Sequence, residues 1–117
     1  MANSITLTGL NNLIETQHQL DWQFFKEGIE ILPLTYHTDG KPASALLRYQ
    51  AGANVPRHKH PGYEHIFVLE GSQRDENGLY QKGSLLISPP GSYHSVTSEQ
   101  GCIVLAIWEK TVEFVDG

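Results

Sequence analysis

The sequence contains a single cysteine, few basic residues and no long apolar run. Cys102 cannot form an internal disulfide, which is compatible with a reducing compartment. Eight Lys and Arg residues against 13 Asp and Glu give a formal charge of −5, so no basic surface indicates nucleic-acid binding. No segment reaches membrane-spanning length, and residues 1–6 lack the basic and apolar parts of a signal peptide. We therefore expect a cytoplasmic protein with no nucleic-acid or membrane partner.

Long helical patterns are also absent, whereas short extended segments alternate with turn residues. The 117 residues are enough for one core and too few for two, so we expect one domain over residues 1–117. Asp39-Gly40, Asn77-Gly78, Pro90-Gly91 and Gln100-Gly101 favour turns. Many short strands with regular turns indicate an all-β sandwich or barrel. The expected strands cover residues 43–50, 64–70, 79–88, 94–98, 102–108 and 112–115.

The first 38 residues give weaker signals. Residues 5–7 alternate as in a short edge strand, and residues 10–14 fit either one helical turn or an irregular segment. Residues 24–38 are predicted to be extended. Pro33 confines that segment to a sheet edge or a break, because proline has no N–H to donate.

Four potential metal ligands occur close to predicted turns. His58 and His60 are two residues apart, so their side chains lie on the same side of an extended segment. A turn at residues 61–62 follows, and Glu64 opens the next strand. His94 stands after a later turn, at the start of another strand. Three imidazoles and one carboxylate are a suitable ligand set for one divalent transition metal ion.

The spacing of these residues resembles the paired motifs of the cupin superfamily. Residues 52–71 match the first cupin motif at every fixed position, and residues 83–98 match the second except that Ser98 replaces the usual Asn. Paired motifs are more specific than one alone. The resemblance implies a double-stranded β-helix, or jelly-roll barrel, with a metal bound inside. The matching positions are Gly52, His58, His60, Glu64 and Gly71, then Gly83, Pro89, Gly91 and His94.

A closer resemblance is to the C-terminal cupin domain of ChrR-type anti-sigma factors. It covers roughly residues 22–108 and rests on segments 56–62, 68–71, 75–80, 89–94 and 99–102. Members of that group also carry an N-terminal helical zinc domain that holds the sigma factor. This chain offers no segment for such a domain, so we expect it not to bind a sigma factor alone.

The ligand set leaves both the metal and the function open. Imidazole and carboxylate ligands accept zinc, iron, nickel, manganese or copper. Four protein ligands saturate tetrahedral zinc, which favours a structural or sensory module. The closeness of the ChrR-type resemblance favours a sensory or small-ligand-binding module, which we expect. A six-coordinate metal keeps two free positions, which favours a small metal-dependent dioxygenase acting on a small organic substrate. A purely structural β-protein is a third alternative.

Several other residues have ordinary explanations. Strand alternation directs His65 to the face opposite Glu64, so we expect it outside the metal site. His18 and His37 have no ligand-type partners at useful spacing and are expected at the surface. Cys102 lies in an apolar strand and is expected to be a small buried residue.

Two expected strands are apolar on both faces. If Glu64 points inward, Phe67 and Leu69 point outward on the same strand, and residues 102–108 carry apolar side chains on both sides. Strands of this kind are normally covered on both faces. The apolar residues of the N-terminal segment offer one cover, and a second copy of the chain offers another. We expect a homodimer.

Overall fold

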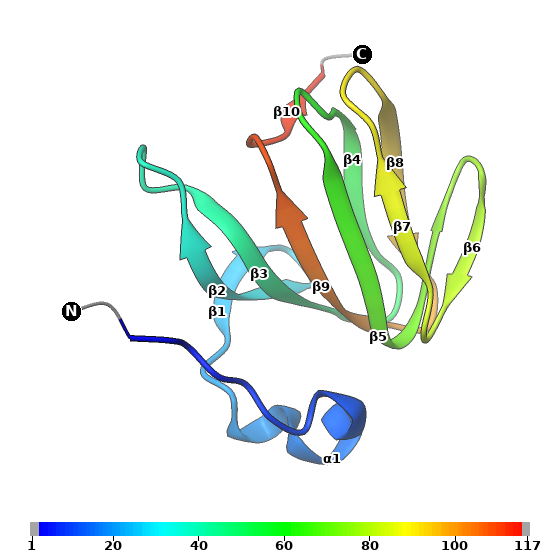
Figure 1. Cartoon of the computed structure of the whole chain (residues 1–117). Helices are drawn as coiled ribbons and strands as arrows, with labels where there is room; N and C mark the ends of the chain where they lie inside the picture. Colours follow the sequence, from blue (N-terminus) through cyan, green and yellow to red (C-terminus); the bar gives the residue numbers. More distant parts are fainter. Residues whose placement is uncertain (1–2, 116–117) are drawn as a thin grey trace.

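The computed structural model describes residues 3–115 and consists mainly of antiparallel strands, as expected for an all-β protein (Figure 1). The strand order is β1-β2-β3-β9-β5-β8-β4-β10, with β6 and β7 also pairing with β5. The bounds are β1 Gln23–Lys26, β2 Ile29–Tyr36, β3 Pro42–Tyr49, β4 Ala53–Lys59, β5 Glu64–Asp75, β6 Gly78–Gln81, β7 Leu85–Ser88, β8 Tyr93–Ser98, β9 Cys102–Trp108 and β10 Glu113–Phe114.

Strand β5 connects the two sides of the curled sheet. Its first half pairs with β7 and β9, and its second half pairs with β6 and β8. A register shift lies between Val68 and Glu70, and Gly71 has a φ of 73°. These irregularities bend β5, so that β4 and β8 lie across from β3 and β9 (Figure 1). The sheet therefore encloses an interior.

Apolar side chains fill most of that interior. Ala45, Val68, Val104 and Ala106 have no exposed surface. They occupy alternate positions of their strands, so that one face of each strand meets the same core. The rest of the core comes from Ile29, Ile31, Leu47, Tyr49, Ala53, Val55, Ile66, Val96 and Cys102. Burial of Cys102 confirms the expectation for that residue.

Some element boundaries differ from the expected ones. The strand predicted over residues 64–70 continues to Asp75, because Gly71 bends it without ending it. The segment predicted over 79–88 divides into β6 and β7. The segment over 24–38 divides into β1 and β2, with Gly28 at a φ of 77° in the turn. Pro33 lies beside a register shift in β2, as the missing N–H requires.

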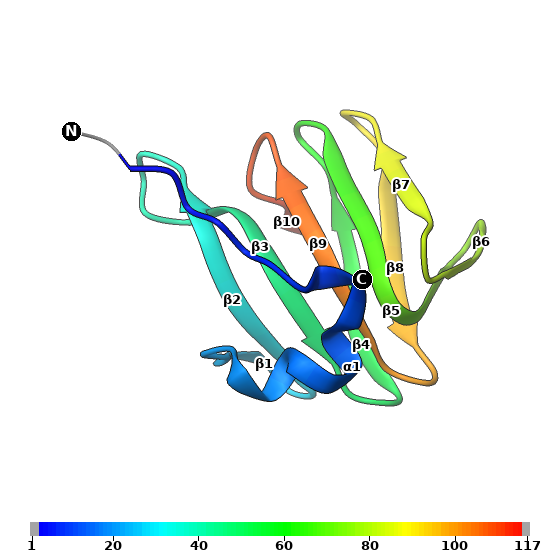
Figure 2. The ribbon, with the colours of Figure 1, turned by 60° about the horizontal axis from the view of Figure 1, so that its bottom comes forward.

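The N-terminal segment is helical only in short turns. The 3₁₀ turns Leu10–Asn12 and Gln17–Gln19 flank α1 (Leu13–Thr16), and residues 3–9 form no strand, so the edge strand expected over residues 5–7 is wrong. This segment crosses the outside of the sheet (Figure 2), where Leu13 is buried. Within residues 3–115, no helix has the length and apolar character needed to cross a membrane.

Candidate metal centre

Strand β4 carries one histidine of the candidate site and delivers a second just beyond its end. His58 lies opposite His94 of β8, and a register shift separates this pair from Val55. His60 follows the strand, where its backbone N–H donates to the carbonyl of Ser92 at 2.9 Å. The connection between β4 and β5 is therefore fixed against the connection that precedes β8.

A tight turn fixes the start of β8. The N–H of Ser92 donates to the carbonyl of Pro89 at 3.2 Å, and Gly91 has a φ of 88°. This conformation is the type II turn that the Pro-Gly pair predicts, because glycine adopts a positive φ without steric cost. The turn places His94 at the second position of β8. Glu64 begins β5, so all four residues meet at one end of the barrel.

The structure brings His58, His60, Glu64 and His94 together as a buried group. One ligand-type atom from each lies within 4.8 Å of all the others, and each residue is at most 5% exposed. Oε1 of Glu64 is 3.1 Å from Nε2 of His60 and 3.5 Å from Nε2 of His94. Two ligands bound to tetrahedral zinc at about 2.0–2.1 Å are about 3.4 Å apart. The spacing therefore suits a metal ion.

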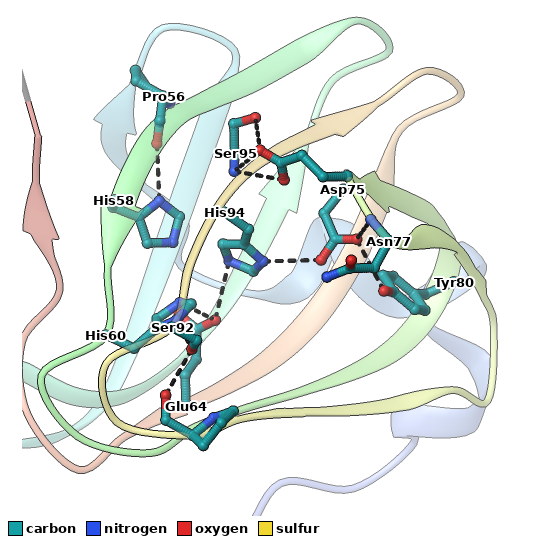
Figure 3. Close-up of polar contacts among 12 residues, drawn as sticks. Pro56, His58, His60, Glu64, Asp75, Asn77, Tyr80, Ser92, His94 and Ser95 are labelled. Carbon is teal, nitrogen blue, oxygen red and sulfur yellow. Dashed lines mark hydrogen bonds and ion pairs between the residues drawn. The ribbon is translucent and has the colours of Figure 1, made fainter. Parts of the chain in front are cut away.

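The outer nitrogen of each imidazole is occupied by a hydrogen bond (Figure 3). Nδ1 of His58 donates to the carbonyl of Pro56 at 2.9 Å, and Nδ1 of His94 donates to the carboxylate of Asp75 at 3.0 Å. Nδ1 of His60 lies 2.9 Å from Oγ of Ser92, which itself donates to a carbonyl. In the neutral form of each ring, Nε2 is then the unprotonated nitrogen, which is the tautomer that binds metals.

One buried atom in this group lacks a hydrogen-bond partner among residues 3–115. Nε2 of His60 is buried, and its approach to Glu64 does not have the geometry of a hydrogen bond. An unpaired buried polar atom costs roughly 1–3 kcal/mol. A metal ion would satisfy this nitrogen and neutralise the buried carboxylate, so the residues present fit such an ion.

The acid–base properties of the group follow from its burial and its internal contacts. Burial alone would raise the pKa of Glu64, but the close imidazoles of His60 and His94 outweigh it and hold the pKa well below the usual value. Burial also opposes protonation of His94, but Glu64 and Asp75 outweigh it and raise the pKa of His94. His58 has a lowered pKa, chiefly because it is buried. The group therefore presents an ionised carboxylate to the imidazoles.

His65 lies outside this group, as strand alternation predicts. It pairs with Ile87 and Ile107 on the outer face of the sheet, and its ring lies 6.4 Å from that of Tyr63. Reasoning from sequence missed two contacts of the ligand residues. Nε1 of Trp108 donates to Oε2 of Glu64 at 2.9 Å, and Asp75 holds His94. Neither contact had a sequence signal, because each depends on strand register.

Asp75 is fixed by the hairpin between β5 and β6. Its Oδ1 accepts hydrogen bonds from the N–H of Asn77 at 2.8 Å and the hydroxyl of Tyr80 at 2.9 Å, while Oδ2 faces His94. The turn expected at residues 75–78 is therefore present, and it carries a ligand-orienting carboxylate. Loss of such a hydrogen bond to a ligating histidine typically weakens metal binding 10–100-fold.

We expect Asp75→Asn to raise the dissociation constant for zinc about 10–100-fold. The neutral amide of the variant is a weaker hydrogen-bond acceptor for Nδ1 of His94 than the carboxylate of Asp75, so it orients the ring less firmly. Competition with a chromophoric chelator measures this constant. Glu76→Gln is the matched control: Glu76 is adjacent to Asp75, but its carboxylate accepts hydrogen bonds from Ser95 and from no ligand side chain, so the zinc affinity of this variant should stay unchanged. Equal affinities of the Asn variant and the parent protein would contradict the orienting role of Asp75.

The antiparallel barrel with a buried group of three histidines and one glutamate defines a cupin. The fold expectation of a jelly-roll barrel is thereby confirmed. Residues 11–111 match the model of the ChrR cupin-like domain family, and the chain belongs to that family. It is 33% identical over 97 residues to the anti-sigma-E factor ChrR of Cereibacter sphaeroides, covering 80% of this chain and 44% of that protein.

Solved structures extend these similarities. ChrR in the crystal structure of its complex with SigE from Rhodobacter sphaeroides is 28% identical, with a TM-score of 0.66 over 83% of this chain and 54% of that one. The chain thus spans about half the length of these ChrR proteins. An acetylacetone dioxygenase from Acinetobacter johnsonii has a TM-score of 0.76 at 18% identity, over 99% of this chain and 80% of that one. The latter similarity concerns the fold alone.

Proposed function

We propose that residues 1–117 form one cytoplasmic cupin domain in which His58, His60, Glu64 and His94 bind one divalent transition metal ion. The convergence of four buried ligand atoms within 4.8 Å carries this proposal. The unpaired Nε2 of His60 and the oriented outer nitrogens support it. Zinc, iron, nickel and manganese all fit the donor set.

The bound metal serves a sensory or small-ligand-binding module. The family membership supports this function, and so does a small cavity that reaches the ligand residues. Metal analysis by mass spectrometry, on protein purified without an affinity column, tests the proposal. One metal ion per chain is expected. A chain that stays metal-free after incubation with each candidate ion and desalting would refute it.

A small metal-dependent dioxygenase is the second candidate. Its support is the fold similarity to an acetylacetone dioxygenase, together with the cavity beside the site. A six-coordinate metal would keep two positions for an organic substrate and oxygen, whereas zinc with four protein ligands is saturated. Oxygen uptake by iron-loaded protein with acetylacetone distinguishes the two functions. Uptake above that of free iron supports the enzyme, and its absence favours the binding module.

We also propose that the chain forms a homodimer through the outer face of the sheet. Phe67 of β5 pairs with Leu85 of β7. Two residues before Phe67 on β5, His65 is flanked by Ile87 of β7 and Ile107 of β9. These four apolar side chains form the outer patch and are 41–57% exposed. The N-terminal segment crosses part of the outside of the sheet (Figure 2), and the four residues of the outer patch remain exposed. A second copy of the chain carries the same outer patch, so a two-fold symmetric contact would bury the two patches against each other.

Light scattering at micromolar concentration should give twice the 13.1 kDa mass of the chain. Phe67→Glu should give the mass of one chain, because it places a charge within the outer patch. Phe24→Glu is the control, since Phe24 is 80% exposed on β1, away from the patch, and the variant should remain dimeric. A monomeric parent protein would mean that no second copy covers the patch.

A further inference from the structure

The two carboxylate oxygens of Glu64 have different partners. Oε1 faces the imidazoles, 3.1 Å from Nε2 of His60 and 3.5 Å from Nε2 of His94. Oε2 accepts a hydrogen bond from Nε1 of Trp108 at 2.9 Å. A carboxylate can bind a metal ion through one oxygen or through both. The indole of Trp108 therefore occupies the oxygen that a two-oxygen contact would need.

Strand register and packing fix the position of this indole. Trp108 ends β9 and lies directly opposite Glu64, the first residue of β5. Two hydrogen bonds continue the pairing beyond the strands: the N–H of Glu109 donates to the carbonyl of Tyr63 at 3.0 Å, and the N–H of Tyr63 donates to the carboxylate of Glu109 at 3.0 Å. The partly buried ring of Trp108 also packs against the hydrophobic core. Nε1 therefore has little freedom to move away from Oε2.

The chemistry of the contact favours its persistence beside a metal ion. Hydrogen bonds to an ionised carboxylate are roughly twice as strong as those between neutral groups. Glu64 is only 5% exposed, so little water competes for its oxygens. An indole N–H is a donor only and cannot itself bind a metal ion. A metal ion that approached Oε2 would therefore compete with Trp108, whereas Oε1 is free to bind it.

We propose that Trp108 is a positioning residue that restricts Glu64 to binding the metal ion through Oε1 alone. Glu64 and the histidines then supply only as many donor atoms as tetrahedral zinc takes. On a six-coordinate metal, a carboxylate bound through both oxygens would occupy one of the positions otherwise open to a small ligand. Trp108 thereby sets how many positions remain. This inference rests on the proposed metal site and concerns the coordination mode of one of its ligands.

Difference infrared spectroscopy of zinc-loaded against metal-free protein, with isotope-labelled glutamate, measures the coordination mode. The separation between the antisymmetric and symmetric carboxylate stretches is wide for binding through one oxygen and narrow for binding through both. We expect a wide separation in the parent protein and a narrow one in Trp108→Phe, which keeps an aromatic ring and frees Oε2. Trp22→Phe is the matched control, because Nε1 of Trp22 donates to the carbonyl of Gln17 at 2.9 Å, in the N-terminal segment. It should keep the wide separation.

Trp108→Gln separates the hydrogen-bond donor from the indole ring. Nε2 of glutamine is as many bonds from Cβ as Nε1 of tryptophan, so this variant offers an N–H at a similar reach without the aromatic ring. We expect it to keep the wide separation of the parent protein. A narrow separation in both variants, or loss of zinc from both, would assign the effect to packing of the indole and overturn the inference. Loss of zinc from Trp108→Phe alone would support the role of the donor.

Zinc content is measured first, so that failure of the metal site is distinguished from failure of the Trp108 contact. A parent protein that binds no zinc would refute the proposed metal site and this inference with it. Full zinc content with a narrow separation in the parent protein would overturn the inference alone. Full zinc content in Trp108→Phe with a separation as wide as in the parent protein, or wider, would also overturn it, because Glu64 would then bind through one oxygen without the indole.

Discussion

Glu64→Ala should remove nearly all bound metal from the purified protein. Glu64 supplies the only carboxylate of the candidate ligand group, and its negative charge offsets that of the cation in a buried site. Loss of an outer hydrogen-bond partner already weakens metal binding 10–100-fold, and loss of a ligand should exceed that. Metal content per chain, measured by mass spectrometry after desalting, gives the result.

His65→Ala is the matched control for this variant. The imidazole of His65 is also a potential ligand and is adjacent in sequence, but it lies on the outer face of the sheet between Ile87 and Ile107. The control should keep one metal ion per chain. An unchanged metal content in Glu64→Ala, with loss in His65→Ala, would move the site to the other face of β5 and contradict the arrangement described above.

Gly71→Ala should destabilise the fold by roughly 2–5 kcal/mol, the sum of a backbone cost and an overpacking cost. Gly71 has a φ of 73°, which costs an L-residue about 1–2 kcal/mol. The added Cβ would also lie 2.1 Å from the carbonyl oxygen of Gly101 and 2.9 Å from Cα of Cys102. Both obstacles are backbone atoms, so no side-chain rotation relieves the clash, and strands β5 and β9 must separate. Urea denaturation measures the free energy of unfolding.

Gly83→Ala separates the clash from the backbone conformation. Gly83 has a φ of 92°, and a Cβ added there would meet no atom within 4 Å. The free energy of unfolding of Gly83→Ala should therefore fall by only about 1–2 kcal/mol, the cost of the left-handed conformation. Equal losses of unfolding free energy in the two variants would mean that the close contact between a Cβ at Gly71 and the carbonyl oxygen of Gly101 does not add to the destabilisation.

The candidate ligands were predictable because their placement depends on local geometry. His58 and His60 share a side through strand alternation, and the turns at residues 61–62 and 89–92 bring Glu64 and His94 to the same end of the barrel. The outward direction of His65 follows from the same alternation. Turn residues also located most of the strands, since glycine and proline interrupt the chain at fixed positions. The boundary at Gly71 was missed because a glycine that ends a strand and one that bends it have the same sequence signal.

Tertiary structure alone decided which residues support the ligands and which remain without partners. Asp75 reaches His94 only because β5 continues through its bend, and Trp108 meets Glu64 only through the register of β9 against β5. The outer patch likewise depends on which strands lie side by side. Turns and alternation act over a few residues and can be read from the sequence. Strand register joins residues that are far apart in the chain, and it is set by packing of the whole core.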